Sequence, residues 1–183
     1  MSGNQDLDHY DQANRLFIEN RPVEAMSYVL EGLQANPEHL ELLTLAGDIY
    51  ITSHEDLGMS EEEACELALD AFLRAIKLEP GLVEAWEGKS RALVHLGRYQ
   101  EALCAAEEGF KVLPMRIGIP NDEIYTNVAE SLFDHKVRAL LSLGRNEEAR
   151  EALSEGFRHC PGSSYLSELI DELVPGLGGL EQD

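Results

Sequence analysis

A pattern of small and apolar positions recurs four times along the chain, in residues 25–37, 68–80, 102–114 and 149–161. In each segment a small residue is followed four positions later by an apolar residue and seven positions later by glycine or alanine. This spacing places all three on one face of an α-helix. Because the proline that closes each segment lacks the amide hydrogen of a continuing helix, we expect each helix to stop there. A second helical pattern, clearest in residues 43–50, precedes each segment, so the sequence predicts four helical hairpins.

The closing prolines also set a repeat length, because Pro80 and Pro114 stand 34 positions apart. The small, aromatic and proline positions of these repeats resemble those of the tetratricopeptide repeat family, which has the same repeat length. The resemblance rests on Gly47, Tyr50, Ala68, Phe72, Ala75, Pro80 and Trp86. It implies one all-α domain over 1–183, a right-handed α-solenoid of about four helical hairpins plus a C-terminal capping helix. The repeats would span about 6–39, 40–82, 83–116 and 130–163, and the capping helix about 164–174.

The chain departs from the family pattern at several helix positions. Ser90 stands in place of the first-helix glycine, and Lys89 and Lys136 stand where leucine is usual. Val137 occupies a position that usually holds a small residue. We therefore expect Val137 to hinder the close approach of the two helices of the fourth repeat.

The segment after the fourth repeat has the features of a cap, which the exposed end of a solenoid requires. Ser163 or Ser164 can cap the start of a helix. An apolar stripe then covers the fourth repeat, formed by Leu166, Leu169, Ile170 and Leu173.

Two repeats are longer than the family length. Pro37 and Pro80 stand 43 positions apart, and we place the extra residues in the turn around 53–60, where Ser60 and Glu63 form a capping box that restarts the second helix. The second excess lies between repeats, after Pro114. There, a helix of about twenty residues capped by Asn121 is expected. The added segment either extends that helix against its neighbour or forms a lip on the binding face, with apolar residues Met115, Ile117 and Ile119.

The net charge of the chain limits the kinds of molecule that it can bind. The 183 residues, 44% of them apolar, suit a single globular domain, and 35 acidic against 14 basic residues give a net charge of −21. Such a charge repels phosphate backbones and anionic membranes, so we expect neither nucleic acid nor a membrane as partner. It suits a basic protein or peptide, although solubility explains it as well. The first ten residues lack the features of a secretory signal, and we expect a cytoplasmic protein.

The sequence contains no motif for catalysis or cofactor binding. Phosphate-loop, HExxH and GxSxG patterns are absent, so we expect no enzyme activity and no cofactor. The three cysteines, Cys65, Cys104 and Cys160, lack metal-site spacing and are interpreted as small buried thiols. The six histidines are scattered. An acidic group near the N-terminus either favours a helix dipole or binds a metal, and we favour the first: Asp6, Asp8, His9 and Asp11.

Family resemblance also implies where a partner binds, namely on the concave surface lined by the first helix of each hairpin. Carrying the family positions over gives thirteen candidate partner-binding residues, Tyr10, Asn14, Phe17, Glu41, Asp48, Ile51, Glu84, Glu87, Arg91, Val94, Asp134, Arg138 and Leu141. One subgroup of the family grips chaperone carboxylate tails with five basic or amide residues. Of these five residues only Asn14 is retained here, and the other matching positions hold Tyr10, Leu45, Glu84 and Gly88. We therefore reject chaperone carboxylate tails as the ligand.

These observations lead to a functional hypothesis that involves binding alone. We expect a protein-interaction adaptor or chaperone-like scaffold that offers an acidic, partly apolar groove to a basic or amphipathic peptide or helix. Two alternatives remain, a specialised secretion chaperone and a structural scaffold that self-associates through stacked solenoid ends.

Overall fold

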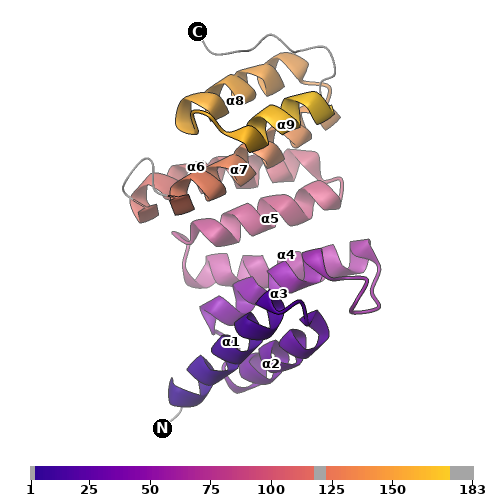
Figure 1. Cartoon of the computed structure of the whole chain (residues 1–183), viewed down its shortest axis with the longest axis vertical. Helices are drawn as coiled ribbons and strands as arrows, with labels where there is room; N and C mark the ends of the chain where they lie inside the picture. The colour runs from indigo at the N-terminus through magenta and orange to yellow at the C-terminus, as the bar shows by residue number, and fades with distance from the viewer. Residues whose placement is uncertain (1–2, 118–122, 174–183) are drawn as a thin grey trace.

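The computed structural model describes residues 3–117 and 123–173, with side chains described in 9–113 and 126–170. Within these ranges the chain forms helices and no strands (Figure 1). The helices are α1 Gly3–Ile18, α2 Pro22–Ala35, α3 Leu40–Thr52, α4 Glu61–Leu78, α5 Val83–His95, α6 Tyr99–Ile117, α7 Glu123–Ser142, α8 Asn146–His159 and α9 Ser164–Leu173.

The helices stack in chain order as four hairpins, α1/α2, α3/α4, α5/α6 and α7/α8, with α9 at the C-terminal end (Figure 1). The fold is an all-α solenoid of the kind that the sequence predicts. Successive first helices touch, α1 with α3, α3 with α5 and α5 with α7, whereas among the described residues successive second helices do not. The first helices therefore line the inner side of the stack. We call the surface of α1, α3, α5 and α7 the inner face and that of α2, α4, α6 and α8 the outer face.

Three of the hairpins turn through the same backbone device. One residue takes a left-handed conformation, with φ of 59° at Asn20, 68° at Gly97 and 72° at Gly144. The next amide then bonds back to the last turn of the first helix, which satisfies carbonyl groups that the helix end leaves open. These bonds run from the amides of Arg21, Arg98 and Arg145 to the carbonyls of Leu16, Leu93 and Leu140, each at 2.9 Å.

The hairpin α3/α4 has a longer turn, residues 53–60, where the sequence predicts an insertion. Ser60 ends it as the N-cap of α4, and its hydroxyl accepts a hydrogen bond from the Glu63 amide at 3.3 Å. Leu57 packs from this turn against the apolar core of the first hairpins. The insertion is therefore anchored to the fold by an apolar contact.

The prediction that every closing proline ends its helix is wrong at Pro114. Helices α2, α4 and α8 end two residues before their prolines, but α6 runs through Pro114 to Ile117. At the other three sites the residue before proline leaves the helical conformation, as at Asn36 with φ −136° and ψ 92°, because proline crowds a helical predecessor. A proline removes one hydrogen bond from the helix ladder, and a helix can continue past that loss.

The second insertion leads into α7, whose 20 residues confirm the predicted long helix. The Asn121 cap lies outside the described residues, as do Ile119 and the side chains of Met115 and Ile117. Whether this segment forms a lip on the binding face stays a prediction.

The small residues of the repeat make room for large side chains of the helix that follows in the stack. A Cβ atom added at Gly109 would lie 2.8 Å from Leu132 of α7, and one added at Gly156 would lie 3.0 Å from Leu166 of α9. Atoms this close overlap, so glycine is required where the helices cross. Val137, for which we expected a looser contact, is itself fully buried in the core.

Helix α9 covers the end of the stack and packs on α7 and α8. Its side chains Leu166, Leu169 and Ile170 are buried, while the side chain of Leu173 lies outside the described residues. Of the two candidate serines, Ser163 is the cap, since its hydroxyl accepts a hydrogen bond from the Leu166 amide at 3.1 Å.

The cysteines are free thiols, and the interpretation as buried small residues holds for two of the three. Cys65 and Cys160 are buried, but Cys104 is exposed on α6. The correction has a simple cause, since Cys104 lies between the buried positions 103 and 105–106 of an amphipathic helix and points outward.

Candidate functional site

Ion pairs occupy the middle of the inner face. Arg91 of α5 donates to the carboxylate of Asp48 on α3, which ties neighbouring hairpins together. Arg138 of α7 donates from Nε to Oδ1 of Asp134 one turn earlier, at 2.6 Å. Burial raises the pKa of Asp48, and the charge and hydrogen bond of Arg91 oppose that shift. Both arginines that the sequence places on this face are therefore already paired with aspartates.

A second polar contact joins α5 to α7 and is more deeply buried. Glu87 Oε1 lies 3.8 Å from His135 Nε2, and the two side chains are 15% and 7% exposed. Burial raises the pKa of Glu87 to about 7, against the opposing charge of Arg91 and with the support of Asp48, Asp134 and Glu84. Glu87 is therefore largely protonated below neutral pH.

His135 is a neutral imidazole under the same conditions. Burial lowers its pKa to about 3, with smaller effects from Arg91, His95 and Arg138. Its Nδ1 atom is buried without a hydrogen-bond partner, as is Nε of Arg91. Buried polar atoms of this kind are uncommon, so the centre of the inner face is under-satisfied.

Towards α1 the inner face continues through an aromatic contact. Tyr10 stacks on His39, with ring centroids 6.4 Å apart and an angle of 22° between the planes. Burial raises the pKa of Tyr10, and the charges of Glu41, Asp11 and Asp48 raise it further. Carboxylates from α1 and α3 thus gather around this ring. Glu41 also lies close to His39, with Oε2 3.3 Å from Nδ1.

The thirteen candidates differ in how far a partner could reach them. Glu41 and Glu84 are exposed, and Tyr10, Asn14, Asp48, Arg91 and Arg138 are half-buried. Phe17, Val94 and Leu141 pack partly against the core. Ile51 and Asp134 are buried at 8% and 6% exposure, and Glu87 is nearly so. The structure brings the polar members together across α1, α3, α5 and α7, and their role in binding stays a prediction.

Two histidines that the sequence does not single out also belong to this face, His39 and His135. A signal for His135 was present. It lies four residues after Ser131 and three before Arg138, and this spacing places all three on one side of α7. The burial that makes His135 unusual depends on the packing of α5 against α7 and leaves no mark in the local sequence.

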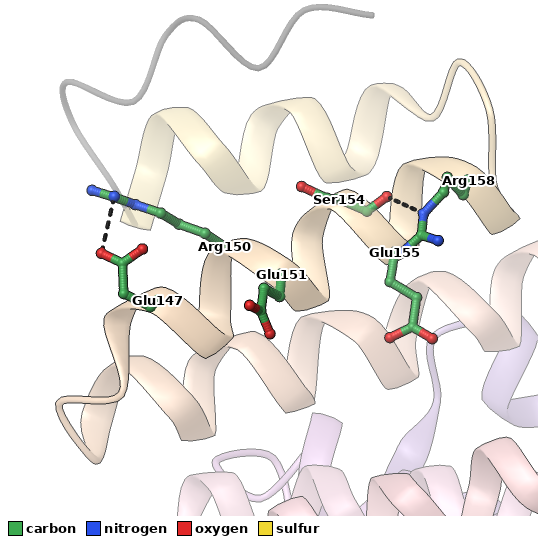
Figure 2. A pocket seen from close by; sticks show the side chains of 6 residues that line it. All are labelled: Glu147, Arg150, Glu151, Ser154, Glu155 and Arg158. Carbon is green, nitrogen blue, oxygen red and sulfur yellow. Dashed lines mark hydrogen bonds and ion pairs between the residues drawn. The ribbon is translucent and has the colours of Figure 1, made fainter.

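The outer face offers a shallow hollow along α8 (Figure 2). It is lined by Glu147, Arg150, Glu151, Ser154, Glu155 and Arg158, all from this one helix. Arg150 already lies 3.2 Å from Glu147, and Arg158 donates to the Ser154 carbonyl at 3.4 Å. We interpret this surface as a solvated helix face, since it lacks apolar side chains and contributions from a second element.

Other kinds of site receive no support from the described residues. In 3–117 and 123–173 no group of three or more histidine, cysteine, aspartate or glutamate side chains is arranged to hold a metal ion. Asp6 and Asp8 lie outside the described side chains, and His9 Nε2 is 3.8 Å from Glu31 of α2. No helix in the same ranges has both the length and the apolarity that a bilayer span requires.

Comparisons with known proteins agree with this architecture. The family model described as tetratricopeptide repeat matches residues 63–111, from the first turn of α4 into α6. A solved structure from work titled as the functional characterisation of Pseudomonas aeruginosa pilF superposes with a TM-score of 0.68. The two sequences are 12% identical, and the superposition covers 93% of this chain and 70% of the other. The likeness therefore concerns the fold. No curated protein matches.

Proposed function

We propose that this chain, which resembles tetratricopeptide-repeat proteins in its fold and over residues 63–111, is an interaction scaffold whose inner face binds a basic, amphipathic peptide or helix of another protein. The observation that carries this proposal is a charge imbalance. Among the thirteen candidates, five carboxylates stand against two guanidinium groups, and each guanidinium is already bonded to an aspartate. The exposed glutamates at 41 and 84 therefore give the face an excess of negative charge, to which Glu87 adds only when it is ionised.

The excess charge supports a cationic partner more than an anionic one. Charged clefts attract ligands of opposite sign and raise the rate of association. Because exposed charges are screened beyond about 8 Å at physiological salt, this contribution should weaken as salt increases. Arg91 and Arg138 contribute little to an anion site, since an acidic ligand would have to displace Asp48 and Asp134.

The apolar part of the face supports an amphipathic partner. Phe17, Val94 and Leu141 are partly exposed at the edge of the core and come from three different hairpins. A helix with one apolar and one basic side could contact them while its cations lie near the glutamates. Ile51 is part of the core itself and adds little to this surface.

The test reverses charges on the inner face without disturbing the fold. Glu41→Lys with Glu84→Lys changes two exposed carboxylates, whereas Glu87→Lys would bury a cation and is avoided. The double variant should weaken binding of a partner isolated by affinity purification from the native extract, and wild-type affinity should fall with added salt. Calorimetry measures both.

The matched control makes the same charge change on the outer face, Glu107→Lys with Glu151→Lys, both exposed. It should leave affinity near that of the wild type. Equal loss in the two double variants would show that overall charge drives association. No loss in either, together with no effect of salt, would assign recognition to the apolar residues and end the acidic-face proposal.

A further inference from the structure

The buried contact between α5 and α7 lies within the face to which we assign binding. We infer that the buried pair Glu87 and His135 carries one ionisable proton, on the Glu87 carboxyl, at the centre of the inner face, and that a cationic segment bound there expels it. The second part rests on the proposed function. The first concerns the chain alone.

The geometry favours a neutral imidazole. A charged imidazolium has two N–H donors and needs an acceptor for each. Here only Nε2 faces a carboxylate, at 3.8 Å, while Nδ1 is buried and has no partner. A donor left unsatisfied in the interior is costly, so His135 stays neutral and the ionisable proton of the pair is the one on the Glu87 carboxyl. The raised pKa of Glu87 and the lowered pKa of His135 agree with this placement.

The surroundings explain why Glu87 keeps that proton. The groups that act on it are Asp48 from α3, Glu84 and Arg91 from its own helix, and Asp134 from α7, while Arg91, His95 and Arg138 act on His135. Arg91 is the cation that opposes protonation of Glu87, and its guanidinium is bonded to Asp48. An ionised Glu87 therefore shares its counter-charge with another carboxylate. A lysine or arginine from a bound segment would supply a separate one.

Binding and proton release are then coupled. A cation next to Glu87 stabilises the carboxylate, so the complex forms with loss of a proton wherever the free protein still holds it. As the pH is raised toward about 7, the affinity should increase by up to tenfold for each pH unit. Above that value it should level off. A surface whose carboxylates are already ionised would show no such slope.

The test uses a synthetic amphipathic helix of lysine and leucine with blocked termini and no histidine, so that only the protein titrates near neutral pH. Calorimetry at about pH 6, in two buffers of different ionisation enthalpy, counts the protons released per complex. We expect close to one for the wild type beyond any release common to all variants. Glu87→Gln, an isostere of the protonated side chain, should lose this release and bind at high pH as weakly as the wild type does at low pH.

The control Glu107→Gln makes the same charge change on the outer face and should keep both the release and the pH slope. Carbon NMR of the Glu87 carboxyl gives a second measure, and its titration midpoint should fall when peptide is added. Binding without a difference in proton release between the wild type and Glu87→Gln overturns the inference and leaves the proposed function intact. Failure of the peptide to bind at any pH counts against the proposed function itself.

Discussion

The ring of Phe72 is held between two first helices, and this contact predicts a large effect from the smallest possible substitution. Phe72 extends from α4, and its ring faces Gly47 of α3 on one side and Gly88 of α5 on the other. A Cβ atom built on Gly47 would lie 2.6 Å from Cε2 and 2.8 Å from Cε1 of the ring. One built on Gly88 would lie 2.7 Å from Cε2. Normal carbon contacts are about 3.5–4.0 Å, so the variant Gly47→Ala forces an overlap.

The size of the effect follows from the lack of an escape route. Overpacking a core costs about 1–3 kcal/mol, and the upper part of that range applies because the backbone at Gly88 blocks the ring from moving away. Alanine also stabilises a helix interior by about 1 kcal/mol relative to glycine, which offsets part of the cost. We expect a net loss of about 2 kcal/mol. For a chain of this length, that loss lowers the melting temperature by about 4–8 °C.

Thermal unfolding followed by circular dichroism measures this shift, with Gly81→Ala as the control. An added Cβ at Gly81 meets no atom within 4 Å, so that variant should melt like the wild type. Combining Gly47→Ala with Phe72→Leu removes the outer ring atoms and should cost at least about 1 kcal/mol less than the two single changes added. If Gly47→Ala melts with the wild type, or if the double variant is simply additive, the ring has room that the structure denies it.

Two further predictions concern the pair on the inner face and the C-terminal cap. Because the pKa of Glu87 is raised from 4.5 to about 7 in the folded chain, its ionisation destabilises the fold as the pH rises through that window. Between about pH 4.5 and 7, the free energy of unfolding of the wild type should fall by about 3 kcal/mol relative to that of Glu87→Gln. Urea unfolding across this range measures both proteins. An equal change in the two would show that the pKa of Glu87 is not raised. Deleting residues 164–183 uncovers the surface beneath Leu166 and Leu169, so sedimentation velocity should detect association. A truncated chain that stays monomeric and equally stable would contradict the capping role of α9.

The sequence by itself determined the secondary structure and the order of the stack. Helical spacing, prolines and serine caps act within a few residues, so their effects are visible in the local sequence. For the same reason the turn at 53–60, the Ser60 cap and the 20-residue α7 could be predicted. The repeat of small residues also identified the fold, because a solenoid uses the same helix crossing many times. Pro114 shows the limit of local rules, since a helix end depends on the balance of packing around it.

Only the tertiary structure decided which polar residues of the inner face are paired, which are buried and which hold a proton. The partners Asp48 and Arg91 are 43 positions apart, and Glu87 and His135 belong to different hairpins, so no spacing rule links them. In the sequence Glu84 and Glu87 are two acidic residues one turn apart. The packing of α5 against α3 and α7 leaves Glu84 exposed and withdraws most of the Glu87 side chain from water. Because the energy of a charge depends on its distance from water and from other charges, the two carboxyls acquire different chemistry.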